Sequence, residues 1–146
     1  ELIGQRWTDV RYWLDIGNTA ESGQFVLGQP LNGRNRRKAQ RLRTVSELFP
    51  EIVDPSLDDN SQPSCSAAEA LDRQHPFINQ TLANHALALL SRLFRCGSIS
   101  YHGGFLTLSS GSSLGLRVEP GVWKSMTARN RKKLPPQINP QPEIQY

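Results

Sequence analysis

The sequence has few cysteines, a single methionine and no long hydrophobic run. Its 146 residues include two cysteines, Cys65 and Cys96, and one methionine, Met126. Sparse cysteine is typical of proteins from a reducing compartment, so we expect a cytoplasmic protein, although the two thiols could pair. No run approaches the roughly 18 apolar residues of a membrane-spanning helix, so we expect no such span. Because the chain starts at Glu1, we also expect further residues upstream of it.

Hydrophobic residues make up 37% of the chain, which is less than in most globular domains. At this length we expect one domain or part of one, with a core built from a few segments. Charge is segregated along the chain although the net charge is only +4. One basic run lies at 34–43 and a second at 124–133, with an acidic stretch at 47–59 between them.

The hydrophobic pattern predicts an α/β protein. Residues 12–16 and 24–28 are predicted strands, and the first is apolar enough to have both faces covered, as in a parallel sheet. The polar segment Asp15–Asn18 is then either a ligand-binding turn at the carboxyl edge of that sheet or a plain turn. Residues 34–63 are expected to form a mobile crossing loop, in which 44–49 make one or two helical turns.

Two helices are predicted in the middle of the chain. The first covers 66–74 and starts with the capping box Ser66 and Glu69. The second covers 76–95, ends at Gly97, and has an apolar stripe broad enough that we expect it to be largely buried.

A change to period two after Gly97 predicts a small antiparallel finish. Its strands are expected at 98–101, 105–108 and 114–118, with turns at 102–104 and 109–113. The folded domain is expected to end at residue 123, and 124–146 are expected to form a basic, proline-rich, disordered tail.

Cys65 is the candidate for chemistry. It precedes the predicted 66–74 helix, where free backbone amides lower a thiol pKa and favour the nucleophilic thiolate, whereas nearby aspartates oppose this. A reactive thiol and an inert or buried one both fit this setting. Cys96 is expected to pack as a small hydrophobe, and His85 to be a core or interface histidine with a hydrogen-bond partner. The chain alone predicts no metal site.

The basic run at 34–43 could bind a phosphate backbone, and a solvated mobile loop is the plainer alternative. It contains no aromatic residue, so base stacking is not indicated. The serine-rich segment 109–115 is predicted to be a hairpin turn and not a phosphate loop, since it lacks the required lysine.

Three segments resemble the C-terminal half of ThiF-family proteins, which are related to ubiquitin-activating enzymes. They read DIGNTAESGQFVLGQP, PSCSAAEAL and NQTLANHALALL. The branch that the chain resembles is the ThiF-like protein of PRTRC cassettes, found on bacterial plasmids and integrated elements. The resemblance covers roughly residues 10–123.

This resemblance implies the C-terminal half of a doubly wound fold with a mixed sheet, one long buried helix and the antiparallel finish. It implies an enzyme that uses ATP and Mg²⁺ to adenylate the C-terminus of a ubiquitin-like or sulfur-carrier protein. Some members then transfer the acyl group to a cysteine, and Cys65 matches that position. Gly23 and Gln24 match a Gly-Gln pair to which we assign a structural role.

The chain departs from the family in having no glycine-rich nucleotide loop and no paired CxxC motifs. We therefore expect no cofactor to bind this chain and expect it to be inactive alone. A half sheet has an unpaired edge, so the chain is expected to form a homodimer, pair with a separate N-terminal half, or be marginally stable. The alternative function is a non-catalytic dimerisation or binding module whose basic loop contacts nucleic acid or an acidic partner.

Overall fold

The computed structural model describes residues 9–38, 40–50 and 74–131, the last four of these by their backbone only. The protein is mixed α/β, which confirms the predicted class. Its elements follow in the order β1 (Trp13–Asn18), β2 (Ser22–Gly28), α2 (Val45–Leu48), α4 (Ile78–Cys96), β3 (Tyr101–Thr107), β4 (Ser112–Arg117) and α5 (Pro120–Arg131).

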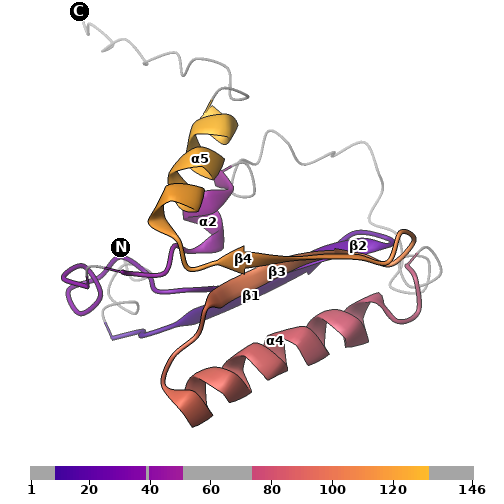
Figure 1. Ribbon diagram of the computed structural model, residues 1–146, viewed down its shortest axis with the longest axis horizontal. Helices are drawn as coiled ribbons and strands as arrows, with labels where there is room; N and C mark the ends of the chain where they lie inside the picture. Colours follow the sequence, from indigo (N-terminus) through magenta and orange to yellow (C-terminus); the bar gives the residue numbers. More distant parts are fainter. Residues whose placement is uncertain (1–8, 39, 51–73, 132–146) are drawn as a thin grey trace, which may run out of the picture.

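The strands form one four-stranded sheet in the order β1-β2-β3-β4. Every pairing among the described residues is antiparallel, where we expected a mixed sheet. Helix α4 covers one face of this sheet, and α2 and α5 lie on the other face (Figure 1). The described elements therefore form three layers, with the sheet in the middle.

Strand β1 is an edge strand and not the buried strand that its apolar run predicted. Tyr12 is 38% exposed and Ile16 is 46% exposed. Asp15 and Asn18, expected in a turn, are both inside β1, where they pair with Val26 and Gly23. A run of apolar side chains does not show how many neighbouring strands are present, which is why the sequence pattern was misleading here.

Strand β3 runs through residues 102–104, which we expected to form a turn. Gly103 pairs with Val26 of β2, and a Cβ atom at position 103 would lie 2.5 Å from the backbone oxygen of Phe25. These glycines therefore allow two backbones to approach closely, which is a role of glycine inside strands as well as in turns. The predicted strands 98–101 and 105–108 are replaced by this one continuous strand.

Helix α4 confirms the most periodic prediction in the sequence. It ends at Gly97, which has the left-handed φ of 69° typical of a helix C-cap. Its buried stripe packs on the sheet and consists of Ile78, Leu82, Ala86 and Leu89. The expectation of a largely buried helix is wrong, however, because Leu87 is 61% exposed and Phe94 is 76% exposed.

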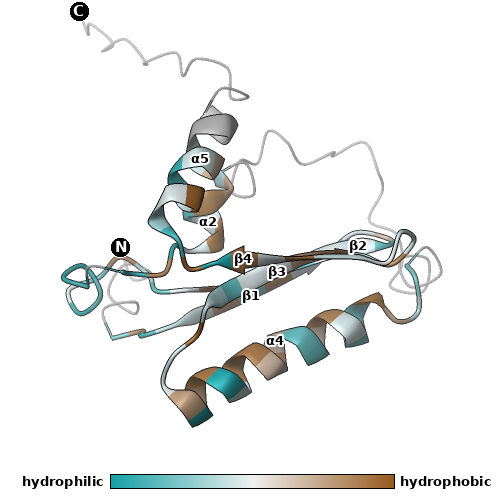
Figure 2. Cartoon of the chain, viewed as in Figure 1, coloured by the Kyte–Doolittle hydropathy of each residue, from teal (hydrophilic) through white to brown (hydrophobic). Residues whose placement is uncertain are grey.

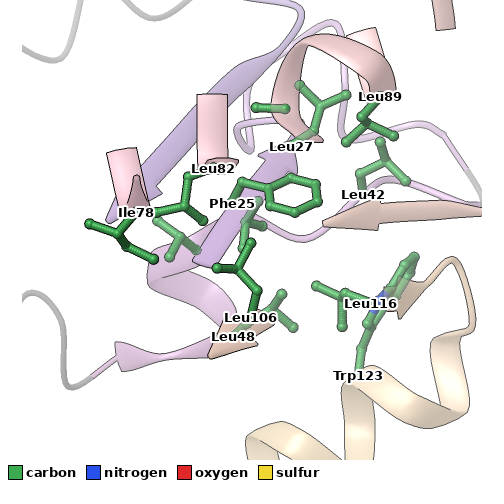
Figure 3. Packing of buried hydrophobic residues seen from close by; sticks show 13 residues of the cluster. Phe25, Leu27, Leu42, Leu48, Ile78, Leu82, Leu89, Leu106, Leu116 and Trp123 are labelled. Atoms are coloured by element: carbon green, nitrogen blue, oxygen red, sulfur yellow. The ribbon is translucent and has the colours of Figure 1, made fainter. Parts of the chain in front are cut away.

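The hydrophobic core lies on both sides of β2. Phe25, Val26 and Leu27 are all at most 3% exposed, and helices from both layers contribute to the same cluster (Figure 3). Strand β2 is central because it pairs with β1 and β3 at once. Figure 2 shows hydrophobic and hydrophilic residues alternating along the α4 ribbon.

Helix α5 occupies a region that we expected to be without structure after residue 123. It extends to Arg131, and it is anchored by Trp123, which is only 5% exposed and belongs to the core cluster. The helix has little amphipathic periodicity of its own, so the packing of Trp123, together with the partly buried Met126, stabilises it. The predicted boundary of the disordered tail at residue 124 is therefore wrong for residues 124–131.

Several predictions lie outside the described residues. They are the loop over 51–63, the helix over 66–73, the Cys65 thiol and the tail from residue 132 onward. Among the helices that the structure describes, none combines the length and the hydropathy of a membrane span.

Candidate anion-binding cleft

The basic loop and α5 enclose an open cleft of about 790 Å³. It is on the α2 and α5 side of the sheet. Its charged lining consists of five cationic side chains and one carboxylate, namely Arg36, Lys38, Arg41, Arg43, Lys124 and Glu47. Its remaining lining residues are Leu31, Pro120, Trp123 and Thr127. The cations come from two segments that lie far apart in the sequence, so the fold brings the two basic runs together.

Two asparagines hold the first part of the basic loop in place. The Asn32 side-chain oxygen accepts hydrogen bonds from the backbone of Arg34 and Asn35 at 3.2 and 3.0 Å. The Asn35 side chain is fully buried, and its amide donates to the carbonyls of Val10, Arg11 and Pro30. Asparagine is well suited to such turns because its side chain mimics a backbone group.

Hydrogen bonds within the loop also fix the backbone of the residues that carry the basic side chains. The backbone of Arg36 donates to the Asn32 carbonyl, and that of Lys38 donates to the Asn35 carbonyl. The Lys38 ammonium lies 5.8 Å from the centre of the Tyr12 ring, close enough for a cation–π contact. We expected a mobile loop; its mobility stays a prediction, but these described residues are tied to the strand β1 side of the molecule.

Arg41 is a structural member of the cleft. It is 8% exposed, its guanidinium forms a two-pronged ion pair with the Glu47 carboxylate, and it donates to the Gln29 carbonyl at 2.6 Å. The Gln29 backbone in turn donates to the Leu42 carbonyl at 2.9 Å. Arg41 therefore joins the end of β2 to the start of α2, and its charge is already paired.

Glu47 is held as a carboxylate by its surroundings. Burial raises its pKa, but hydrogen bonds from Arg41 and from the Thr44 backbone, with the charges of Arg41 and Arg43, outweigh burial and lower the pKa to about 2. The same carboxylate completes the capping box of α2 with Thr44. The acidic group of the cleft is therefore engaged by Arg41 and Arg43 and forms no ion pair with Arg36, Lys38 or Lys124.

Arg36 and Lys124 have no ion-pair partner among the described residues, and both are exposed. Arg43 is half exposed and shares Glu47 at 3.2 Å. An anion entering the cleft would thus meet uncompensated positive charge on both walls. Guanidinium groups in particular match the geometry of phosphate oxygens.

Two buried aromatic side chains support α5 beneath the cleft. The ring of His102 is 5.2 Å from that of Trp123, edge to face, and its Nδ1 donates to the Leu27 carbonyl at 2.9 Å. Burial lowers the pKa of His102, while the hydrogen bond to Leu27 opposes this, so the ring is neutral near pH 7. We expected His102 in a turn, whereas this fully buried residue lies in β3 and contacts β2 and α5.

The structure separates the residues that the sequence offered for chemistry. Cys65 lies outside the described residues. Cys96 is exposed, which corrects the expectation that it packs inside. His85 is also exposed and stacks on Phe25 at 5.9 Å, so it is a surface residue and not a core one. No group of three potential metal ligands occurs among the residues that the structure places.

Sequence reasoning found the basic loop but missed its partner in the cleft. Lys124 was assigned to a disordered tail because nothing near it shows helical periodicity. The one available signal for a helix was Pro120 followed three residues later by Trp123. Proline favours the first turn of a helix, and a tryptophan side chain often anchors a helix to the core. A comparison with family models, curated proteins and solved structures finds no match for the chain.

Proposed function

We propose that the protein is a nucleic-acid-binding module that holds the phosphate backbone in the cleft between the basic loop and α5. One observation carries this proposal. Exposed cations from both walls face the same cleft, while Glu47, the only carboxylate among its described lining residues, is already engaged by arginines. Contacts of this type bind phosphates regardless of base sequence.

The composition of the cleft favours nucleic acid over an acidic protein. Two of the exposed lining cations are arginines, Arg36 and Arg43, and arginine binds a phosphate through two parallel hydrogen bonds. A cleft of about 790 Å³ also offers more room than a single inorganic anion needs. The Trp123 ring is too deeply buried for base stacking, so the bases are expected to remain outside the contact.

Fluorescence anisotropy with labelled DNA of about 20 nucleotides, single-stranded and duplex, tests this function. We expect duplex affinity to fall with salt, with a log–log slope of about −0.9 for each phosphate contacted. The double variant Arg36→Gln and Lys124→Gln should weaken binding at least about tenfold and make the slope less steep by about 2.

The matched control is Arg92→Gln with Arg95→Gln, which removes the same charge from exposed positions of α4 on the opposite face of the sheet. This control should retain most of the affinity. Equal losses in both double variants would mean that net charge and not the cleft attracts DNA. Equal affinity for polyglutamate of the same length would indicate an acidic protein partner instead and would contradict the proposal.

A second proposal comes from the sequence resemblance alone. We infer from PSCSAAEAL that Cys65 is the acyl acceptor of a ThiF-type activating enzyme, and that the sheet is the C-terminal part of its doubly wound fold. The antiparallel pairing of the described strands is compatible with the antiparallel strands expected after Gly97, but it does not distinguish this family from others. ATP, Mg²⁺ and the carrier protein belong to this proposal.

The test of the second proposal is a covalent adduct. Because the chain has no nucleotide loop of its own, it is combined with a ThiF-type N-terminal half that carries one. With ATP, Mg²⁺ and a candidate carrier, this complete protein should form a thiol-sensitive conjugate, and Cys65→Ser should abolish it while Cys96→Ser leaves it unchanged. A conjugate that persists in Cys65→Ser would show that this cysteine is not the acceptor.

A further inference from the structure

Helix α4 carries a second apolar stripe beside the one that packs on the sheet. Its members are Ala83, Leu87, Leu90 and Phe94, which are separated by four, three and four residues. Ala83, Leu87 and Leu90 each follow a residue of the inner face by one position, and Phe94 follows Leu93, which packs against the core. The stripe is thus rotated by about 100° around the helix. This spacing is that of a helix that packs against another helix.

The stripe is available on the surface of the described structure. Leu87 is 61% exposed and Phe94 is 76% exposed, while Ala83 and Leu90 are half-buried at its border with the core. Helix α4 packs against β1, β2 and β3, and no described helix covers its outer side. Single exposed apolar residues are common, but here two exposed side chains seven residues apart are joined by two half-buried ones into one heptad-spaced row, and such a row indicates an interface.

The surroundings of the stripe suit a second copy of this chain. Its polar neighbours Gln80, Asn84 and Ser91 are uncharged, and α4 contains no acidic residue. The arginines of α4, Arg92 and Arg95, lie about 170° and 110° around the helix from the centre of the stripe. Two identical helices can therefore meet here without bringing like charges together, although the whole chain is cationic.

The order of side-chain sizes selects an antiparallel pair. With a two-fold axis between Leu87 and Leu90, each Leu87 faces the Leu90 of the other copy, and the small Ala83 faces the large Phe94. A parallel pair would instead place Phe94 against Phe94 and Ala83 against Ala83, which crowds one end and leaves a gap at the other. The isologous antiparallel arrangement fills the interface evenly.

We propose that the protein forms a two-fold symmetric dimer in which the Ala83–Phe94 stripes of two α4 helices pack antiparallel. This dimer does not depend on the nucleic-acid proposal, because the cleft lies on the opposite face of the sheet (Figure 1).

Sedimentation velocity on the full chain tests the dimer. At about 100 µM the wild type should sediment as a dimer, as expected for a dissociation constant in the micromolar range. Leu87→Glu should raise that constant at least about tenfold, since it places two carboxylates near the axis. Ala88→Glu is the matched control, because it adds the same charge to an exposed position outside the stripe and should leave the dimer intact.

The direction of pairing has its own test. Ala83→Glu or Phe94→Lys alone should weaken the dimer. The two together should restore it, since the carboxylate introduced at position 83 then faces the ammonium introduced at position 94 of the other copy. Absence of rescue in the double variant would overturn the antiparallel register.

Two further outcomes would overturn the rest of the proposal. A wild type that is monomeric at the same concentration would overturn the dimer. Equal effects of Leu87→Glu and Ala88→Glu would overturn the assigned stripe. Circular dichroism confirms that each variant is folded.

Discussion

At the scale of single residues, the most informative group is the Glu47 carboxylate. It accepts hydrogen bonds from Arg41, Arg43 and the Thr44 backbone, and so connects the basic loop to α2. A pKa of about 2 in the folded protein, against 4.5 for an ordinary glutamate, means that folding favours its ionised form. Its contribution to stability is therefore fully present above pH 4.5 and is lost as the pH falls toward 2.

Glu47→Gln should remove this pH dependence. Because the side chain is partly exposed and solvent screens the pair, we expect the free energy of unfolding to fall by about 1–2 kcal/mol at pH 7. Near pH 2 the two proteins should differ much less. Urea unfolding followed by circular dichroism at several pH values measures both quantities.

Glu119→Gln provides the comparison, because Glu119 forms an exposed ion pair with Arg117 at 3.5 Å. Such pairs contribute little, so its pH profile should follow that of the wild type. If Glu47→Gln also followed the wild type, Glu47 would be an ordinary surface carboxylate despite its contacts.

Single residues also show where glycine was misread in the sequence. Gly103 and Gly104 lie next to each other, a pattern that we took for a turn, but both have φ values outside the left-handed region. Their purpose in β3 is space, since a Cβ at position 104 would lie 2.9 Å from the Phe25 ring. Sequence alone does not distinguish a glycine needed for its dihedral angles from one needed for lack of a side chain.

At the scale of elements, α2 rests directly on the end of β2. A Cβ at Gly28 would lie 2.5 Å from the Thr44 Cα, which is the N-cap of α2. Backbone cannot move aside as a flexible side chain can, so this glycine determines how closely the two elements approach.

Gly28→Ala should push α2 away from the sheet and destabilise the protein by about 1–3 kcal/mol. It should also weaken DNA binding, because Arg41 and Arg43 directly precede Thr44 in the chain and would move with it. Thermal unfolding and the anisotropy titration report these two effects. Gly33→Ala is the control, since a Cβ there meets nothing within 4 Å and should change stability by less than about 0.5 kcal/mol. Equal stabilities of the two variants would disprove the tight contact.

Helices α4 and α5 differ in how they are stabilised. Helix α4 has a full apolar stripe and a Gly97 cap, both visible in the sequence. Helix α5 depends on the burial of Trp123 and on partners from β2 and β3 that lie far away in the chain. The first could be predicted from local pattern, and the second only from tertiary contacts.

At the scale of the whole molecule, two candidate surfaces lie on opposite sides of one sheet. The cationic cleft is beside α5 and the apolar stripe is on α4. These two helices lie on opposite faces of the sheet (Figure 1). An α4 dimer would therefore leave both clefts free. Arg36→Gln with Lys124→Gln should leave the dimer unchanged, and Leu87→Glu should leave the binding of a short oligonucleotide unchanged, so the two proposals can fail independently.

The resemblance of the chain to ThiF-family proteins is a hypothesis from the sequence. The motif containing Cys65 lies outside the described residues, and the described strands form an antiparallel sheet that many α/β proteins could share. The covalent-adduct experiment, and not the fold, decides that question.

Short-range chemistry was enough to predict the α/β class, the long helix with its glycine cap, the helical turn at 45–48 and the basic character of the loop. These features follow from periodicity, capping and charge within a few neighbouring residues. The cleft, the place of β1 at the edge, the path of β3 through its glycines and the existence of α5 required the folded chain. Each depends on which distant segments pack together, because burial and close approach are properties of pairs of segments and not of either one alone.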